Sequence, residues 1–297
     1  MNSALFSGCA SALVTPFLPD GSLDEPALRR LIAMQLDAGM DALVLLGTTG
    51  EPCTLSMAER ERVISIGVET VHGTMPVIVG TGSNDTHKAI QYARQARALG
   101  AQGQLSVTPY YNKATQTGLV RHYGAVLDSC DLPMILYNVP GRTGMGITSA
   151  TAKELAVHPN IVGIKEASGD PSLTAEILAK TGGSLPVYCG NDDQILPLMA
   201  LGARGAISVC ANVVPAQTRA VTRACLSGCY EQAQAAQQAL IPLIRALFSQ
   251  VSPIPVKAAL SMLGLCHDVL RLPLTPMEEP HRGQLAHVMR EMGLTES

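Results

Sequence analysis

Apolar residues along the chain fall into two alternating patterns. Eight short runs, rich in β-branched residues, are separated by longer segments in which apolar positions recur every three or four residues. Short runs bounded by turn residues indicate buried strands, whereas the longer spacing is typical of amphipathic helices. Eight strand–helix units in series, without hairpin signals, predict an α/β fold, a (β/α)8 TIM barrel. The runs cover residues 9–17, 42–47, 76–80, 104–108, 133–138, 161–166, 186–189 and 205–210.

The strand pattern stops before residue 229. Residues 230–250, 256–263 and 280–292 have the spacing of helices. We therefore expect a barrel over residues 1–228 and a small C-terminal helical region over 229–297. A doubly wound sheet is the weaker alternative, because it usually needs fewer strands and often carries a glycine-rich phosphate-binding turn that this chain lacks.

Composition and charge limit the functional classes. Apolar residues make up 47% and charged residues 15%, which permits a large core and argues against disorder. The net charge is −3 and no basic stripe is present, so nucleic acid is not an expected partner. No run approaches the roughly 18 apolar residues of a membrane span. The 8 cysteines have no zinc-type spacing, and we interpret them as reduced thiols of a cytoplasmic protein.

The run at residues 161–166 carries a lysine, Lys165, near its end. Val162 and Ile164 are expected on one side of the strand and the intervening residues on the other, so the strand can be buried on both faces. Burial disfavours an ammonium ion, and a neutral amine attacks carbonyl carbons to form a Schiff base. The alternative is a structural lysine that extends to solvent or pairs with Glu166.

The other predicted strands also end on polar residues. Active sites of such barrels lie at the carboxyl ends of the strands, so this convergence favours a site there. Threonine and asparagine are common turn residues as well, and we expect about half of these positions to be structural caps. The residues are Thr15, Thr48, Thr49, Thr81, Thr108, Tyr137, Asn138, Lys165, Glu166, Gly190, Asn191 and Ser208.

A glycine-rich turn, GTTGE, follows the second strand. Its glycines can direct backbone amides and the hydroxyls of Thr48 and Thr49 toward a carboxylate. The alternative is an ordinary turn between strand and helix. In either case Glu51 can be a buried acceptor that braces the loop.

Three more side chains are candidates for chemistry. Tyr137 could move protons near the lysine amine or be a core tyrosine. Arg142 could bind a substrate carboxylate through two hydrogen bonds or lie on the surface. Tyr111, beside Tyr110, could belong to an interface or to the site. The 7 histidines lack ligand spacing and no phosphate loop is present, so neither metal nor cofactor is predicted. A buried lysine without a cofactor is typical of class I aldolase chemistry.

Five motifs in one order complete the pattern: GTTGE from Gly47, TPYYN from Thr108, YNVPGRTG from Tyr137, GIKEAS from Gly163 and PIPVK from Pro253. With them the chain resembles the dihydrodipicolinate synthase family of the pyruvate-dependent lyases, from residue 8 to about 294. The resemblance implies a lyase that condenses pyruvate with L-aspartate 4-semialdehyde through a Schiff base, on the route to diaminopimelate and lysine.

The resemblance also implies catalytic roles. Lys165 forms the Schiff base with pyruvate, and Tyr137 donates and accepts protons there. Thr48 and Tyr111 complete a proton relay with Tyr137. In the family this second tyrosine comes from a neighbouring subunit, which implies a homo-oligomer, a tetramer built as a dimer of dimers.

Substrate contacts follow from the same resemblance. The amides of Thr48 and Thr49 hold the pyruvate carboxylate, and Arg142 binds the carboxylate of the semialdehyde. Gly190 and Ile207 line the pocket near the lysine.

Three positions depart from the members of the family that L-lysine inhibits. Their effector site carries histidines and a glutamate where this chain has Met57, Arg60 and Lys88. Lys88 would repel the ammonium group of an effector that a carboxylate attracts, so weak or absent feedback is expected. Ser252 stands where the family often has asparagine before PIPVK, which leaves the packing of that turn open.

Two other functions remain as alternatives. One is a pyruvate-dependent aldolase that acts on a different aldehyde, against which Arg142 argues. The other is a barrel that binds a ligand without turnover, against which the full set of Lys165, Tyr137 and both threonines argues.

Overall fold

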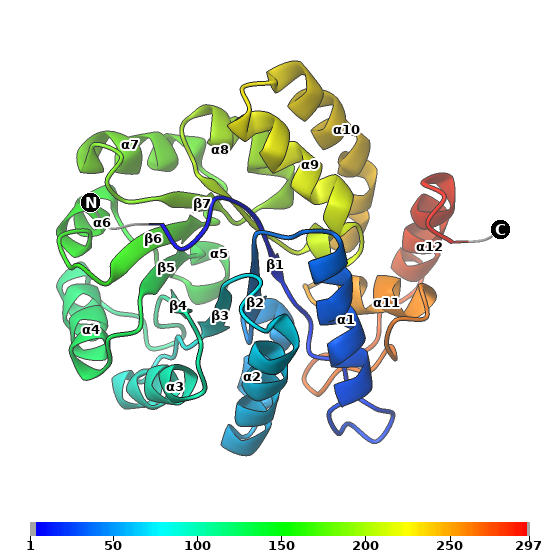
Figure 1. The fold of residues 1–297 in the computed structure, drawn as a ribbon, viewed down its shortest axis with the longest axis horizontal. Helices are drawn as coiled ribbons and strands as arrows, with labels where there is room; N and C mark the ends of the chain where they lie inside the picture. Colours follow the sequence, from blue (N-terminus) through cyan, green and yellow to red (C-terminus); the bar gives the residue numbers. More distant parts are fainter. Residues whose placement is uncertain (1–3, 296–297) are drawn as a thin grey trace.

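The computed structural model describes residues 4–295, in which eight parallel strands close into a barrel. Each strand pairs with the next in sequence, and β8 pairs with β1 to close the ring (Figure 1). A side-chain carbon at Gly205 would lie 1.9 Å from the carbonyl oxygen of Gly8, so this closing contact requires glycine. The predicted α/β barrel is confirmed. The strands are β1 (Gly8–Ala12), β2 (Ala42–Leu45), β3 (Val77–Gly80), β4 (Gly103–Val107), β5 (Met134–Asn138), β6 (Ile161–Glu166), β7 (Val187–Cys189) and β8 (Gly205–Ser208).

Helices follow the strands and surround the barrel (Figure 1). Local signals start several of them: the predicted capping box at α2 is formed, with the Ser56 hydroxyl accepting from the Glu59 amide and the Glu59 carboxylate accepting from the Ser56 amide. The helices are α1 (Glu25–Asp37), α2 (Met57–Val71), α3 (Thr86–Ala98), α4 (Gln116–Ser129), α6 (Ser149–Leu155), α7 (Pro171–Thr181), α8 (Ile195–Ala200) and α9 (Pro215–Leu226). Short helical turns at the strand ends are η1 (Thr48–Gly50), η2 (Pro52–Thr54), α5 (Pro140–Thr143), η3 (Asp192–Gln194) and η4 (Cys210–Asn212).

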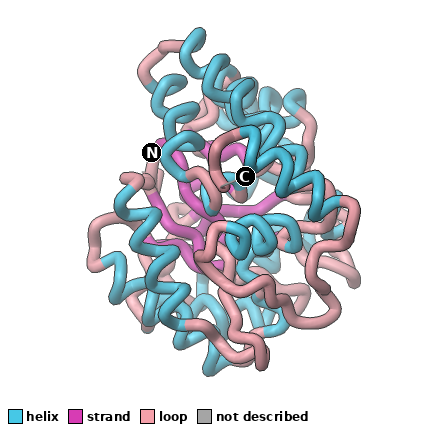
Figure 2. The backbone as a smooth tube through the Cα atoms, turned by 90° about the vertical axis from the view of Figure 1, so that its right-hand side faces the viewer, coloured by secondary structure: helices cyan, strands magenta, loops and turns pink. Residues whose placement is uncertain are grey.

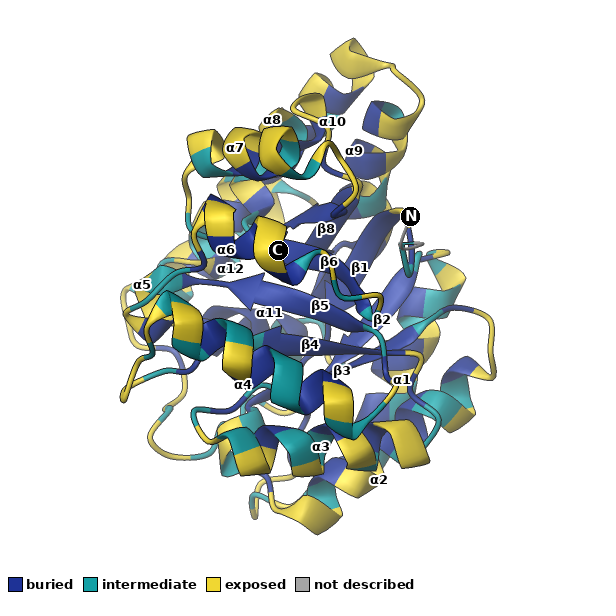
Figure 3. Cartoon of the chain, turned by 90° about the vertical axis from the view of Figure 1, so that its left-hand side faces the viewer, coloured by how far each residue is buried: buried dark blue, intermediate teal, exposed yellow. Residues whose placement is uncertain are grey.

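Apolar side chains form two layers. The larger one lies between strands and helices, so the strands are buried while the helices keep exposed outer faces (Figure 3). The smaller one, which includes Tyr137 and Tyr188, fills the barrel interior. Phe6 stacks on the Tyr188 ring with 4.4 Å between centroids, and its carbonyl accepts a hydrogen bond from the Tyr188 hydroxyl. Since Phe6 precedes β1, this contact closes the amino end of the barrel.

The prediction that Val162 and Ile164 share one side of β6 is wrong. Val162 belongs to the inner layer, whereas Ile164 belongs to the outer layer. The register between β5 and β6 shifts at this point, with Met134 opposite Ile161 and the following residue opposite Gly163. The extra residue changes which positions face inward, which is the usual effect of a bulge.

β1 and β8 end earlier than predicted because side chains take over their hydrogen bonds. β1 stops at Ala12, and the Val14 amide donates to Asn212 Oδ1 instead of to a strand neighbour. β8 stops at Ser208, where the chain turns into η4 and the Ala211 amide donates to the Ser208 hydroxyl oxygen. These turns end the strands on the rim where the candidate residues lie.

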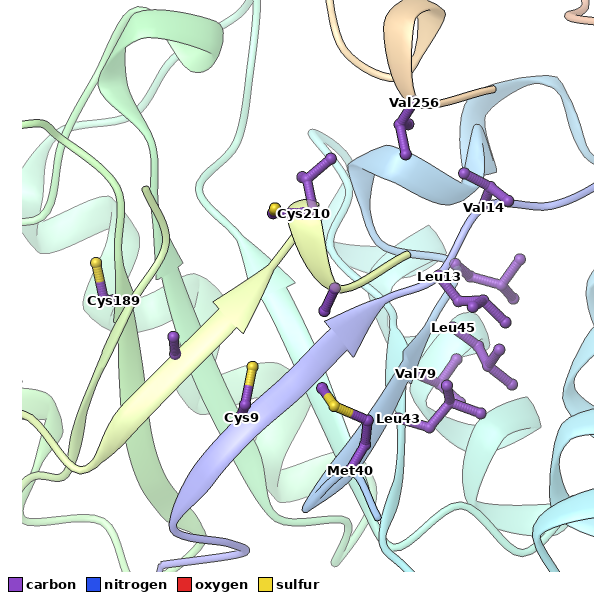
Figure 4. Close-up of a cluster of buried hydrophobic side chains, with 14 of the residues drawn as sticks. Cys9, Leu13, Val14, Met40, Leu43, Leu45, Val79, Cys189, Cys210 and Val256 are labelled. Atoms are coloured by element: carbon purple, nitrogen blue, oxygen red, sulfur yellow. The ribbon is translucent and has the colours of Figure 1, made fainter. Parts of the chain in front are cut away.

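The C-terminal region consists of α10 (Tyr230–Leu247), α11 (Ile254–Met262) and α12 (His281–Glu291). α10 packs on α9 and α12, and Figure 2 faces the side of the molecule that carries these helices. Val256 of α11 joins the same cluster as Val14, which follows β1 (Figure 4). The region therefore packs against the barrel rather than apart from it. The division into two domains after residue 228 stays a prediction.

Over residues 4–295, every helix is too short or too polar to cross a lipid bilayer.

Candidate active site

Lys165 lies at the carboxyl end of β6, between two tyrosines on the neighbouring strands. In the strand register it is opposite Tyr137 of β5 and Tyr188 of β7. Its Nζ lies 4.5 Å from the centroid of the Tyr137 ring, and both side chains are buried. The structure thus brings together the two residues predicted to carry the imine chemistry.

Glu166 does not pair with Lys165. Its carboxylate accepts from Asn138 Nδ2 at 2.7 Å and from the Ser168 amide at 2.6 Å. Burial raises the pKa of this carboxyl, and the two hydrogen bonds oppose the shift. Within residues 4–295 Lys165 forms no ion pair, so the structural alternative of a Lys165–Glu166 pair does not hold.

Asn138 fixes the two strand ends that carry the site. Besides binding Glu166, its Oδ1 accepts from the Ile147 amide at 2.9 Å, and its carbonyl accepts from the Ala167 amide. These bonds tie β5, β6 and the loop after α5 together. Asn138 is fully buried, so each of its polar atoms needs such a partner.

The GTTGE motif forms the 3-10 turn η1 above the end of β2. Thr48 is partly exposed and Thr49 is buried. The first backbone N–H groups of a helical turn have no acceptor within that turn. The N–H groups of Thr48 and Thr49 therefore make no hydrogen bond within η1. Thr15 donates to the carbonyl of Gly50 at 2.7 Å, which makes Thr15 one of the structural caps expected at the strand ends.

Glu51, the last residue of this motif, is a buried acceptor as expected. It forms an ion pair with Lys257 of α11 at 2.5 Å, and both side chains are almost completely buried. Sequence reasoning did not find Lys257, although PIPVK was one of the five motifs, because its partner lies at the other end of the chain.

A cavity of about 330 Å³ opens at this rim. Thr48, Tyr137 and Arg142 line it, together with residues of the C-terminal region such as Ser252 and Leu274. Arg142 is exposed on α5 and donates from Nη2 to the carbonyl of Ser252 at 3.1 Å. The cavity is of the size that holds small ligands, and two arginines, Arg60 and Arg142, line it together with several hydroxyl side chains.

Gly190 and Ile207 are not among the residues that line this cavity. Gly190 follows β7 directly and packs against the Lys165 side chain. Ile207 of β8 is buried in the inner apolar layer with Tyr137. Gly190 is therefore beside the lysine, and the role of Gly190 and Ile207 in lining the substrate pocket stays a prediction.

Tyr111 is apart from the other catalytic candidates within one chain. Its side chain is 91% exposed in the loop after β4, where its φ angle is +69°. The adjacent Tyr110 does line the cavity. An exposed aromatic ring is a frequent component of interfaces. The contribution of Tyr111 across a subunit interface stays a prediction.

Asp192 is a buried carboxylate near the lysine that sequence reasoning missed. It accepts from the amides of Val209 and Cys210 at 3.0 and 2.8 Å. Burial raises the pKa of Asp192, while hydrogen bonds and the charge of Lys165 oppose that shift. The only sequence signal was its place directly after the predicted Gly190–Asn191 strand end. In the part of the chain described, no group of three His, Cys, Asp or Glu side chains is arranged to hold a metal ion.

Of the three positions that the resemblance links to feedback, Arg60 lines the cavity. Arg60 is buried, its guanidinium stacks 3.9 Å from the centroid of Tyr92, and its Nη2 donates to the Gly80 carbonyl at 2.7 Å. Met57 and Lys88 are exposed.

Comparisons with known proteins agree with this geometry. Residues 5–292 match the model of the dihydrodipicolinate synthetase family. A 4-hydroxy-tetrahydrodipicolinate synthase from Citrifermentans bemidjiense is 47% identical over 98% of this chain and 100% of that protein.

Two solved structures give the same result. The dihydrodipicolinate synthase of Thermotoga maritima has a TM-score of 0.95 and 43% identity, covering 98% of this chain and 99% of its own. A chloride-inhibited dihydrodipicolinate synthase from Acinetobacter baumannii, solved in complex with pyruvate, has a TM-score of 0.95 and 42% identity, covering 97% and 99%. The chain therefore belongs to the dihydrodipicolinate synthetase family.

Proposed function

We propose that the protein is a 4-hydroxy-tetrahydrodipicolinate synthase, which condenses pyruvate with L-aspartate 4-semialdehyde. The observation that carries this proposal is the buried amine of Lys165 beside the ring of Tyr137, which lines a cavity together with Thr48 and Arg142. The named relatives favour this reaction over an aldolase with another aldehyde, and over a barrel that only binds. The product belongs to the route toward diaminopimelate and lysine, and we place the enzyme in the cytoplasm.

In the first half-reaction the neutral amine of Lys165 attacks the keto carbon of pyruvate. Loss of water from the carbinolamine gives an imine, with protons moved by Tyr137, whose ring lies against the amine. The amides of Thr48 and Thr49 bind the pyruvate carboxylate. The structure of the relative from Acinetobacter baumannii with pyruvate supports this choice of first substrate.

In the second half-reaction the imine loses a proton from the former methyl group and becomes an enamine. The enamine carbon attacks the aldehyde carbon of the semialdehyde, whose oxygen takes up a proton and becomes a hydroxyl. The amino group of the added chain then attacks the imine carbon and releases Lys165 as a free amine. The ring closes, and one water is lost over the whole reaction.

Arg142 selects the second substrate. Its Nη2 is engaged with the carbonyl of Ser252, which holds the guanidinium at the cavity mouth. The remaining N–H groups can bind a carboxylate with two parallel hydrogen bonds. An aldehyde that carries its own carboxylate fits this arrangement better than a neutral sugar chain.

Tyr111 completes the proton relay from a second subunit. Its exposure and its absence from the cavity lining within one chain support a role across an interface. The functional protein would then be a homo-oligomer, a tetramer built as a dimer of dimers.

The test combines turnover with chemical trapping. Formation of 4-hydroxy-tetrahydrodipicolinate from the two substrates should be measurable with a coupled reductase, and borohydride should fix pyruvate on Lys165. The Lys165→Ala variant should lose both. Trapping without turnover would assign a different aldehyde, and a wild-type protein that traps no pyruvate would refute the Schiff-base mechanism.

A further inference from the structure

The turn that carries Thr48 and Thr49 is held in place from the opposite end of the chain. Glu51 closes the turn, because its amide donates to the carbonyl of Thr48 at 3.2 Å. Glu51 has φ and ψ of 51° and 45°, the left-handed conformation that a residue with a side chain rarely adopts. Such a backbone persists only where surrounding contacts fix it.

The C-terminal region contacts both carboxylate oxygens of Glu51. Oε1 forms the buried ion pair with Lys257 at 2.5 Å, and Oε2 accepts from the backbone amide of Arg271 at 3.1 Å. Lys257 Nζ also donates to the carbonyl of Val269 at 2.8 Å and lies 4.1 Å from the centroid of the Phe17 ring. Each of these partners restricts where the Glu51 side chain can lie.

Arg271 also binds the segment that follows the turn, up to the start of α2. Its guanidinium donates to the carbonyl of Thr54 at 2.8 Å and binds the carboxylate of Glu59 at the start of α2. It also donates to the carbonyl of Gly21. Residues 51–59 are thus fixed at three points by one arginine.

Stability alone does not account for the Lys257–Glu51 pair. Well-packed apolar residues often replace a buried ion pair without loss of stability, because burial of two charges is itself costly. Burial lowers the pKa of the Lys257 amine and the Glu51 carboxylate opposes this shift, so the two groups depend on each other. What an apolar pair cannot reproduce is the electrostatic attraction that holds the left-handed residue next to the site.

We propose that Lys257 and Glu51 are positioning residues of the reaction: their ion pair sets the conformation of the Thr48–Thr49 turn and thereby the binding of the pyruvate carboxylate. This inference rests on the proposed function, since it takes the turn to be the pyruvate site. It gives the PIPVK motif a role in catalysis although Lys257 touches no substrate.

The test uses a variant that removes both charges, Lys257→Met/Glu51→Gln. It leaves no unpaired buried charge and keeps an oxygen that can accept from the Arg271 amide, so it should fold where Lys257→Met alone fails. We expect KM for pyruvate to rise roughly tenfold or more, since small misplacements of binding groups have effects of this size. KM for the semialdehyde, which depends on Arg142, should change much less. An unchanged KM for pyruvate would overturn the proposal.

Hydrogen exchange of residues 47–55 provides a readout that needs no substrate. In the double variant the amides of Gly50 and Glu51, which donate to Gly47 and Thr48, should exchange faster than in the wild type. Unchanged exchange would overturn the proposal even if the wild type traps no pyruvate. Failure of the proposed function would appear separately, as absence of pyruvate trapping in the wild-type protein.

The ion pair between Arg219 and Asp41 offers a matched control. It joins the two side chains at 3.4 Å and is partly buried, but Asp41 precedes β2 and therefore lies at the amino ends of the strands. Arg219→Met should lower stability and leave both KM values and the exchange of residues 47–55 unchanged. A comparable change in this control would mean that loss of stability, and not loss of position, raises KM.

Discussion

A side-chain carbon at Gly190 would lie 3.0 Å from Cε of Lys165. The same carbon would be 2.6 Å from Cβ of Ala167 and 3.0 Å from the carbonyl oxygen of Glu166. The absence of a side chain at the end of β7 therefore leaves the space that the lysine occupies. Movement of the lysine alone cannot relieve the contact with Ala167, so an added side chain would shift the backbone around Lys165 and displace its amine.

Gly190→Ala should accordingly impair imine formation. We expect the rate of pyruvate trapping on Lys165 to fall about a hundredfold, because displacement of a nucleophile by an ångström has effects of this order. Mass spectrometry of the borohydride-reduced adduct measures the rate. Gly124→Ala on α4 is the matched control, since nothing lies within 4 Å of a carbon added there. Normal trapping in Gly190→Ala would contradict the assigned packing.

Arg142→Ala should separate the two substrates. Loss of the guanidinium removes the group that binds the second carboxylate, so KM for the semialdehyde should rise by about one to two orders of magnitude. Trapping of pyruvate should stay within a factor of about two, because Lys165 and the Thr48 turn are untouched. Arg142→Lys should recover only part of the loss, since lysine lacks the paired N–H groups. Equal effects on both substrates would argue against this assignment.

Glu59 predicts a pH dependence of stability. The hydrogen bond from Arg271 holds the pKa of Glu59 at about 2, although partial burial opposes it. Because the folded protein lowers this pKa below its usual value of 4.5, the stabilisation is present above pH 4.5 and is lost as the pH falls toward 2. Because solvent screens this partly exposed pair, its contribution at neutral pH is about 1 kcal/mol, less than the pKa difference alone would give.

Urea unfolding of the wild type and of Glu59→Gln measures this effect. The variant should be less stable at pH 6, and the two curves should converge as the pH is lowered toward 3. If the difference in unfolding free energy between the two proteins is independent of pH, the charge of Glu59 does not contribute to stability. Glu69→Gln is a suitable control, because its pair with Arg29 is largely exposed and should have little effect at any pH.

Local patterns were sufficient for the barrel and for the position of Lys165. The run at residues 161–166 matches β6, because a short β-branched segment bounded by turns has few other conformations. The side on which Val162 lies could not be predicted, since it depends on a register shift against β5. Periodicity within one strand carries no information about its partner.

The contacts that hold the site depend on distant parts of the chain. Glu51 could be identified as a buried acceptor, but its partner Lys257 is brought to it only by the packing of α11 on the barrel. Asp192 was missed for a similar reason, because its burial results from the turn after β8. The resemblance identified substrate contacts, whereas the residues that position them required the fold.

Feedback by L-lysine should be weak or absent. Arg60, which lines the cavity, and the exposed Lys88 are cations at positions where the resemblance implies histidine and glutamate, and a cation there disfavours binding of a second cation. Activity should therefore persist at millimolar L-lysine, and strong inhibition at sub-millimolar concentration would contradict the prediction. Lys88→Glu tests the cause: it replaces the exposed cation by a carboxylate and should increase sensitivity if charge is the barrier.

Complementation between two inactive variants tests the role of Tyr111 in another subunit. Lys165→Ala and Tyr111→Phe should each be nearly inactive. In a hybrid dimer, one site combines the intact lysine of one subunit with the intact tyrosine of the other. If subunits mix at random, half of the dimers are hybrids with one intact site in two, so about a quarter of the activity should return.

The matched control mixes Lys165→Ala with Tyr137→Phe. Both of these residues belong to the site of one chain, because the Lys165 amine lies 4.5 Å from the Tyr137 ring centroid. Every site in such a hybrid lacks one of the two groups, so no activity should return. Recovery in the first mixture and not in the second requires that Tyr111 crosses an interface. No recovery in either mixture, with exchange of subunits verified by native mass spectrometry, would restrict Tyr111 to its own chain, where it lies 91% exposed and away from the cavity.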